Sequence, residues 1–342
     1  MAQSQDMFPV IFESLKRDET CWICFFDCFY KKRQLANYNK SELVDFFSQK
    51  CKQLGFKQPK VDFFNVEERS LYNEKYKKYV PKNVFVQEIN PKYPSWYPRV
   101  DKNRTRVVHF AWWDESKHLR NPLIDVDFSI LKQSNDIKYG YENYNTKYFG
   151  NLRLDHLAYS QKSERRKRCF IPETYLRMSD KYKNSSMKIV EFCDELIVFL
   201  REQEFEIVWK KREKGYPIEN WASPLDFCKE KPDIIIEKDL YFPSALMDYA
   251  YRSDICIVLN DCFAFFDMMH VNTNCCILTT AGGRKHKIDQ FFLADHQQDI
   301  IDMTVKDSWQ ALSKRLKKSN EYEYNLEIEN NVSRKILNYC EG

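Results

Sequence analysis

The stretch 252–280 carries the residues whose types and spacing best suit chemistry. It reads RSDICIVLNDCFAFFDMMHVNTNCCILTT: an apolar run, a polar turn, a segment with helical period and a second apolar run. In an open α/β sheet a ligand lies beyond the carboxyl ends of the strands, where a following helix offers free amides and its positive dipole end. We therefore expect a nucleotide at Asn260, Asp261 and Cys262, with Asp267 on its ribose. Alternatively, Asn260 and Asp261 are only turn and cap residues.

Basic side chains and a pair of glycines follow two other apolar runs and are expected to complete the phosphate site. Lysine and arginine neutralise phosphate, and arginine binds it bidentately. Adjacent glycines let backbone amides approach a ligand closely. Solvated surface charges and an ordinary tight turn are the alternative interpretations. The candidates are Lys210, Lys211, Arg212, Gly282, Gly283 and Arg284.

A general base is expected near the end of the predicted strand 106–110. His109 is the first choice because imidazole titrates near neutral pH and can accept the proton of an acceptor hydroxyl. Asp114 and Glu115 are the alternatives for this role. A histidine beside aromatic residues is also typical of a core position, so a structural role for His109 stays open.

The composition excludes several classes of nucleotide-binding protein. Only 7 of the 342 residues are glycine, and no GxGxxG fingerprint or GxxxxGK[ST] loop can be written from them. The cysteines lie mostly in apolar runs, which is typical of buried thiols in a reducing compartment. Cys21 and Cys24 form one CxxC pair, but no second pair or spaced histidines complete a zinc site, so no metal is expected.

Short β-rich apolar runs alternate with longer segments of helical period, which indicates α/β layering. These are the elements that must position the candidate residues. The expected strands are 21–26, 61–66, 83–88, 106–110, 125–130, 169–171, 206–209, 233–237, 255–259 and 275–278. The expected helices are 41–54, 67–79, 187–203, 243–251, 263–270, 309–318 and 332–339.

A basic stretch without periodicity, 160–168, is typical of an interdomain connection, and the alternation of strands and helices restarts after it. The expected fold class is therefore α/β, with two Rossmann-like domains facing a cleft. The predicted boundaries are 1–160 for the first domain, 161–320 for the second, and 321–342 for a closing helix that packs back on the first.

Five segments, taken together, resemble GT-B glycosyltransferases, nearest to the CDP-glycerol glycerophosphotransferase and capsule polysaccharide transferase group. FGNLRLDHL (149–157) resembles the Gly-x-Pro-Arg-x-Asp element that ends the first domain, and CFIPET (169–174) the Pro-Thr strand end that opens the second. EIVWKKR (206–212) stands at the family's strand followed by Lys and His-Pro. The stretch 239–267 resembles a helix, strand, acidic-Ser-Ser turn and helix, and RVVHFAWWDESKHL (106–119) the strand and His-Gly-x-x-x-Lys loop.

The sequence departs from this pattern at three places. Trp112-Trp113 stand at the family's His-Gly, Cys262-Phe263 at its paired serines, and Lys211-Arg212 at its His-Pro. These departures leave the general base and the identity of the donor open.

The resemblance implies transfer of a sugar or polyol-phosphate from a nucleotide-sugar or CDP-polyol donor to a hydroxyl of a glycan or similar polymer, as in polysaccharide biosynthesis. The first domain would take the acceptor and the second the donor, without a cofactor or metal. Lys117 and Gly150 match family positions near the cleft. Arg153 and Asp155, near the predicted junction, either contact donor or acceptor or only form a salt bridge between the domains.

A non-catalytic module on the same fold, binding nucleotide or nucleic acid, is the alternative function. Basic stretches such as 165–168 and 314–318 and the many aromatic residues suit nucleic acid, but a net charge of +4 gives this little support, so no nucleic acid is expected. The longest apolar runs are far shorter than a membrane span. We expect a cytoplasmic protein, with peripheral association with the inner face of a membrane as a further expectation.

Overall fold

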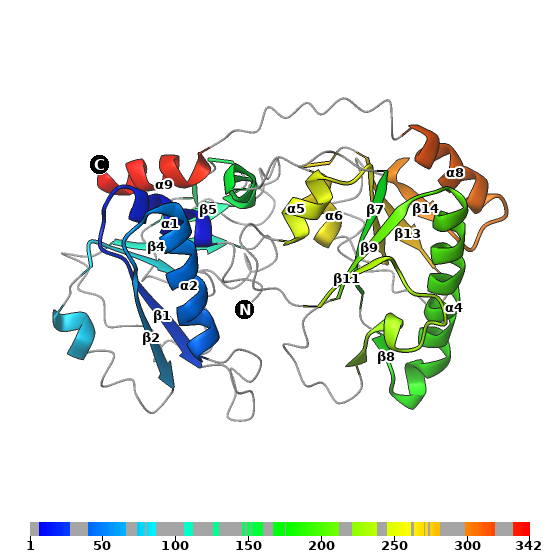
Figure 1. The fold of residues 1–342 in the computed structure, drawn as a ribbon, viewed down its shortest axis with the longest axis horizontal. Coiled ribbons are helices and arrows are strands. Elements are labelled where there is room, and N and C mark those ends of the chain that lie inside the picture. Colours follow the sequence, from blue (N-terminus) through cyan, green and yellow to red (C-terminus); the bar gives the residue numbers. More distant parts are fainter. Residues whose placement is uncertain are drawn as a thin grey trace. The chain divides into compact units, whose positions relative to one another are not determined.

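The computed structural model divides the chain into two units, Met1–Asp155 with Glu329–Gly342 (unit 1) and His156–Ile328 (unit 2) (Figure 1). The structure describes residues 7–27, 40–65, 74–78, 81–86, 106–111, 126–129, 146–147, 149–150, 152–159, 167–174, 176–211, 221–237, 245–260, 263–269, 271–272, 274–280, 298–318 and 331–342.

Unit 2 is built on a six-stranded sheet in which every neighbouring pair is parallel. The strand order is β11-β9-β7-β12-β13-β14. The chain thus builds outward from β7 in one direction, then returns and builds outward in the other, which is the doubly wound order. The strands are β7 (Arg168–Pro172), β9 (Glu206–Lys210), β11 (Ile234–Ile236), β12 (Ile255–Leu259), β13 (Cys275–Thr279) and β14 (Ile300–Asp302).

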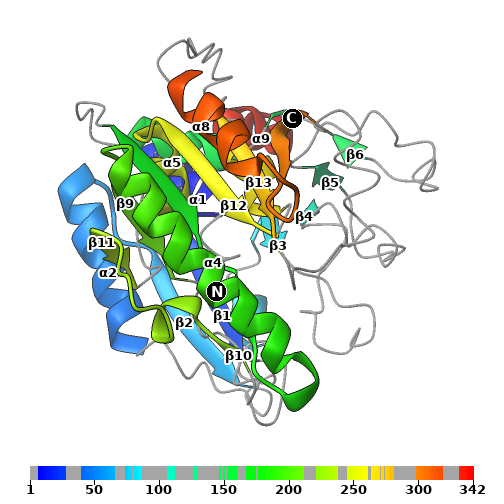
Figure 2. The ribbon, with the colours of Figure 1, turned by 90° about the vertical axis from the view of Figure 1, so that its right-hand side faces the viewer.

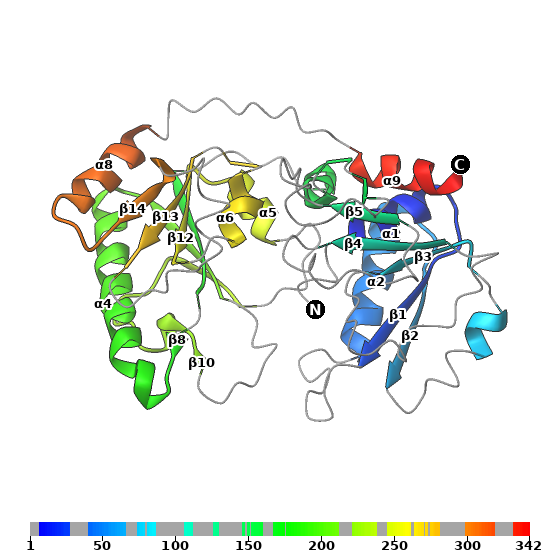
Figure 3. The same ribbon diagram turned by 180° about the vertical axis from the view of Figure 1, so that it is seen from behind.

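Helices cover both faces of this sheet. On one face α4 and α8 lie side by side (Figure 2), and Trp309 of α8 contacts the rings of Phe192 and Phe199 of α4 at 5.7 and 4.8 Å between centroids. On the other face α5 contacts β7 and β9 while α6 contacts β12 and β13 (Figure 3). The helices are α4 (Asp180–Glu202), α5 (Ala245–Tyr251), α6 (Phe263–Met269) and α8 (Ser308–Lys318).

Burial on both faces explains the apolar sequences of the central strands. All five residues of β7 and all five of β12 are buried, as parallel strands covered by helices on both sides require. A small antiparallel pair and a 3-10 turn lie outside this sheet: β8 (Leu176–Arg177), β10 (Trp221–Ala222) and η8 (Pro224–Asp226).

Unit 1 contains a four-stranded parallel sheet in the order β3-β4-β5-β6 and a separate parallel pair, β1 with β2. Helix α9 comes from the far end of the sequence and packs against α1. Their core joins Met7, Val10 and Val108 to Ile336 and Leu337. The elements are α1 (Phe8–Lys16), β1 (Trp22–Asp27), α2 (Lys40–Leu54), β2 (Lys60–Asn65), β3 (Asn83–Val86), β4 (Arg106–Ala111), β5 (Val126–Ser129), β6 (Thr146–Lys147) and α9 (Val332–Glu341). The 3-10 helix η7 (Leu152–Tyr159) spans the boundary between the two units.

Several elements differ from the sequence-based expectations, among them α4, α1 and β14. Helix α4 begins at Asp180 rather than at 187. Its first two turns were not predicted from the sequence because they are polar and lack the apolar stripe that marks the rest of the helix. Helix α1 was not expected; its Pro9 lies in the first helical turn, where proline is tolerated. Strand β14 was also not expected, and it has only three residues.

Candidate functional site

The carboxyl ends of β7, β9, β12 and β13 meet at one edge of the unit 2 sheet, because the strands are parallel. The strand order reverses between β7 and β12, and this reversal is where open α/β sheets bind ligands. Each strand is followed at this edge by a polar residue: Glu173 after β7, Lys211 after β9, Asn260 after β12 and Thr280 after β13.

Asn260 uses its side chain to join the ends of β12 and β13. Its Nδ2 donates to Thr280 Oγ1 at 2.8 Å, and its Oδ1 accepts from the Thr280 N–H at 2.8 Å. The Asn260 N–H donates to the Leu278 carbonyl at 3.0 Å. The φ of Asn260 is +53°, a left-handed conformation that asparagine tolerates better than most residues. The amide therefore serves the structure of this edge, and its contact with a ligand stays a prediction.

Glu173 is a functional candidate that sequence reasoning did not single out. Its side chain is 7% exposed, and Oε2 accepts hydrogen bonds from Ser223 Oγ at 2.6 Å and Trp209 Nε1 at 3.2 Å. Its N–H donates to the Lys210 carbonyl at 2.9 Å. A buried carboxylate needs such donors. The sequence feature that could have identified Glu173 is its position, since it directly follows an apolar strand that ends in a proline.

The two described lysines of the expected phosphate site lie at the end of β9. Lys210 is the last residue of the strand and is partly exposed. Lys211 Nζ lies 3.4 Å from Asp226 Oδ1 and 3.8 Å from Glu237 Oε1. Ion pairs this exposed and this long are weak, so a phosphate can compete for the Lys211 ammonium.

The remaining donor-site candidates are only partly within the described residues. Asp267 lies in the seven-residue helix α6, which begins at Phe263 directly after the site edge; the structure gives its backbone position. The others lie outside the described residues: Arg212, Asp261, Cys262, Gly282, Gly283 and Arg284.

Among the unit 1 candidates, His109 lies within β4 rather than at its end, since the strand continues to Ala111. Its backbone is in register with Val86 of β3 and Asp127 of β5. Arg153 lies in η7. The other candidates of the first domain's loop lie outside the described residues: Asp114, Glu115 and Lys117.

Gly150 and Asp155 have clear structural roles in unit 1. Gly150 is buried with φ +117°, a conformation that only glycine adopts without strain. The Asp155 carboxylate is 4% exposed and accepts hydrogen bonds from the N–H groups of Asn331, Val332 and Ser333 at 3.2, 3.0 and 2.6 Å, and from the Ser333 hydroxyl. It therefore caps the first turn of α9. Burial raises the pKa of Asp155, and these hydrogen bonds oppose that rise.

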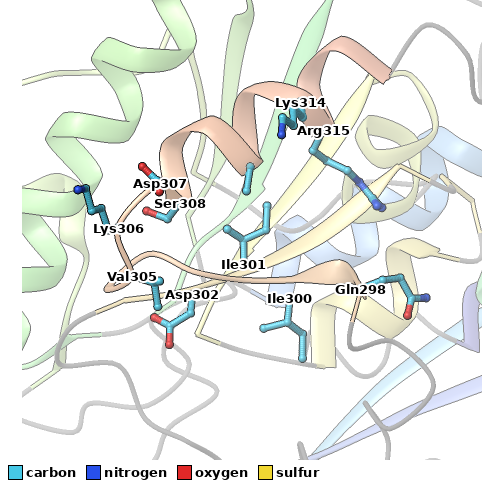
Figure 4. A pocket seen from close by; sticks show the side chains of 11 residues that line it. Gln298, Ile300, Ile301, Asp302, Val305, Lys306, Asp307, Ser308, Lys314 and Arg315 are labelled. Atoms are coloured by element: carbon cyan, nitrogen blue, oxygen red, sulfur yellow. The ribbon is translucent and has the colours of Figure 1, made fainter.

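A pocket of about 500 Å³ lies along the outermost strand of the unit 2 sheet, between β14 and α8 (Figure 4). Its lining mixes Lys306 and Lys314 with Asp302 and Asp307. Arg315 in its wall is engaged by Asn274 Oδ1, the Cys275 carbonyl and Asp299 Oδ1 at 3.0, 2.9 and 2.8 Å. No single sign of charge dominates this pocket, so it does not suit a phosphate better than the edge described above.

Partial burial of the CxxC pair disfavours the thiolate form of both cysteines. Burial raises the pKa of Cys21 to about 11 and raises that of Cys24 further, and a thiol is a nucleophile or metal ligand only as its thiolate. Within the described ranges no cluster of three histidine, cysteine or acidic side chains is placed to hold a metal ion. No helix in the described part combines the length and apolar character needed to cross a bilayer.

Comparisons with protein-family models and with curated protein sequences find no match to this chain. Solved structures do resemble it. A UDP-GlcNAc 2-epimerase from Methanocaldococcus jannaschii, in complex with UDP-GlcNAc and UDP, aligns with a TM-score of 0.56 at 14% identity over 99% of this chain and 96% of that one. A UDP-N-acetylglucosamine 2-epimerase described as putative, from Listeria monocytogenes, gives 0.56 at 11% identity over 100% and 94%.

MnaA from S. aureus, solved with UDP, gives a TM-score of 0.51 at 12% identity over 94% of this chain and 96% of that one. None of the three is named as a CDP-glycerol transferase, so the likeness concerns the fold and not that group. The expected class is confirmed: the chain has an α/β fold with parallel sheets, of the two-domain GT-B-like kind.

Proposed function

We propose that this protein binds a nucleotide sugar at the carboxyl edge of the unit 2 sheet, where β7 and β12 diverge. The strand order of the sheet carries the proposal, because its reversal between β7 and β12 defines one edge where the following segments separate and leave room for a ligand. Polar groups follow the strands at this edge, including Lys211 and Asn260.

The structural likeness supports this class of ligand. Of the similar structures described above, two were solved with UDP, one of them also with UDP-GlcNAc, and these two align over more than nine-tenths of both chains. In the proposed site the amides at Asp261 and Cys262 hold phosphate, and Asp267 binds the ribose. Cations and a glycine turn complete it: Lys210, Lys211, Arg212, Gly282, Gly283 and Arg284.

We further propose that the protein is an enzyme that transfers a sugar or polyol-phosphate to a hydroxyl acceptor. His109 would accept the acceptor's proton, with Asp114 or Glu115 as alternatives, while the cations stabilise the departing phosphate. No cofactor is proposed beyond the activated donor. A polymer acceptor and a peripheral position on a membrane are part of the same proposal.

Epimerisation of the sugar while it stays attached to its nucleotide is a second candidate reaction. The likeness to proteins named UDP-GlcNAc 2-epimerases favours it. The two candidates differ in one observable: transfer requires an added acceptor, whereas epimerisation changes the donor alone.

The experiment is a titration of the protein with UDP, UDP-GlcNAc, CDP-glycerol and uridine, followed by thermal unfolding and calorimetry. A ligand that binds only the folded state at 100 times its Kd stabilises that state by about 2.7 kcal/mol. The phosphate-bearing ligands should raise the unfolding temperature, and uridine should not. NMR of UDP-GlcNAc with and without glycerol or a polyol polymer then separates the two reactions.

Lys211→Ala tests the site itself, with Lys57→Ala as its matched control. Both lysines form exposed ion pairs, Lys211 with Asp226 and Lys57 with Asp18, but only Lys211 lies at the proposed site. Loss of one cation near phosphate should weaken UDP binding about tenfold or more, the worth of one charge-assisted hydrogen bond. Absence of stabilisation by every nucleotide in the panel would contradict the proposed function.

A further inference from the structure

The bridge between Asn260 and Thr280 has a role beyond closing the sheet. Asp261 and Cys262 follow Asn260 directly in the sequence, while Gly282, Gly283 and Arg284 begin two residues after Thr280. The two segments that carry these proposed donor-binding residues therefore start from the two ends of one side-chain bridge.

The backbone at Asn260 is distinctive within the described residues. Four other non-glycine residues there have positive φ, and each adjoins a helix end: Asp18, Glu204, Asp307 and Asn331. Asn260, with φ +53°, instead directly follows a buried strand at the edge where the strand order reverses. Left-handed backbone at a non-glycine residue costs energy and persists only where its surroundings fix it. Here the two hydrogen bonds to Thr280 do so.

We infer that Asn260 is a positioning residue for the donor. Backbone pairing brings β12 and β13 together, and the Asn260 amide fixes the residues that directly follow the two strands, Asn260 and Thr280, against each other. Donor affinity depends on this fixed arrangement of the two strand ends. The inference rests on the proposed function, since it concerns the same site. It assigns Asn260 no contact with the ligand; the side chain acts by joining Asn260 to Thr280 at the ends of the two strands.

Thr280→Val and Thr280→Ser form the decisive pair of variants. Valine keeps the shape of threonine but removes the Oγ1 that accepts from Asn260 Nδ2, whereas serine keeps this acceptor. Loss of one buried hydrogen bond should raise the Kd for UDP about fivefold in Thr280→Val. Thr280→Ser should bind UDP within about twofold of the wild type, because the bridge is restored.

Asn260→Gly is the second test, because glycine adopts the left-handed backbone without strain and removes only the bridge. We expect its Kd for UDP to rise about tenfold, since both side-chain hydrogen bonds are lost. Asn331→Gly is the matched control: it changes another left-handed asparagine, with φ +78°, which precedes α9 in unit 1. Its Kd for UDP should equal that of the wild type.

All affinities are measured by calorimetry at one temperature, well below the unfolding midpoint of the least stable variant. Equal Kd values for Thr280→Val, Thr280→Ser and the wild type would overturn the inference, whether or not Asn260→Gly folds. So would an equal loss of affinity in Asn331→Gly, which would indicate a general effect of destabilisation. Failure of the wild type to bind UDP or UDP-GlcNAc would overturn the proposed function first, and the inference with it.

Discussion

Removal of the Asp155 carboxylate should loosen α9 without disturbing unit 2. An ordinary N-cap substitution costs about 1 kcal/mol. Here the residues that lose their acceptor include Val332 and Ser333, both buried, and an unsatisfied buried donor costs about 1–3 kcal/mol. The cap together with two stranded N–H groups gives an expected loss of about 3 kcal/mol for Asp155→Ala.

Native-state hydrogen exchange measures this loss locally, which matters because a chain of two units need not unfold in one step. A loss of 3 kcal/mol corresponds to about a 100-fold fall in the protection of the α9 amides. The amides of β12 in unit 2 should keep their protection. Asp18→Asn is the control, because the Asp18 side chain is 76% exposed and pairs with the exposed Lys57, and asparagine tolerates the left-handed backbone at this residue, where φ is +61°. A fall of less than about threefold at α9 would refute the reasoning.

Asp62 should contribute stability that disappears in acid. Burial raises its pKa, but hydrogen bonds from Lys75 Nζ and Trp22 Nε1 outweigh burial and hold the pKa below its ordinary value. Its contribution is therefore complete above the ordinary pKa and lost as the pH falls below it, so the stability difference between wild type and Asp62→Asn in urea unfolding should shrink from about pH 6 to about pH 3. Arg315→Lys should destabilise unit 2 by about 2 kcal/mol, because one ammonium cannot reach the three acceptors that the guanidinium joins. Thermal unfolding checks this against Lys314→Ala, an exposed neighbour on α8; equal midpoints would contradict it.

Apolar periodicity predicted the elements of unit 2 well because helices on both faces bury its strands. The run ICIVL could only be a buried strand, and it is β12. The same reasoning missed β14, whose three residues are partly or fully exposed at the sheet edge. Such a short edge strand is defined by its pairing with β13, and pairing leaves no mark in a three-residue sequence.

The candidate site was harder to predict than the fold. Strand ends could be located from the sequence, so Asn260 and Lys211 were identified as edge residues. The partners of these residues could not be identified from the sequence, because they lie far along the chain. Asn260 binds Thr280, 20 positions away, and Lys211 pairs with Asp226, 15 positions away. Asp155 shows this most clearly: its partners lie more than 170 residues away, and nothing local in the sequence distinguishes a distant helix cap from a charged cleft residue.

The packing of α9 on α1 affects the order in which the two units can fold during synthesis. Unit 2 is continuous from His156 to Ile328, whereas unit 1 needs residues from both sides of it. As the chain leaves the ribosome, the segment that begins with α1 emerges before unit 2, yet the surface around Met7, Val10 and Val108 lacks its α9 partner until α9 has emerged. Unit 2 can therefore complete its fold earlier, although its sequence comes later. During that interval the nascent chain exposes an apolar surface of the kind that chaperones bind.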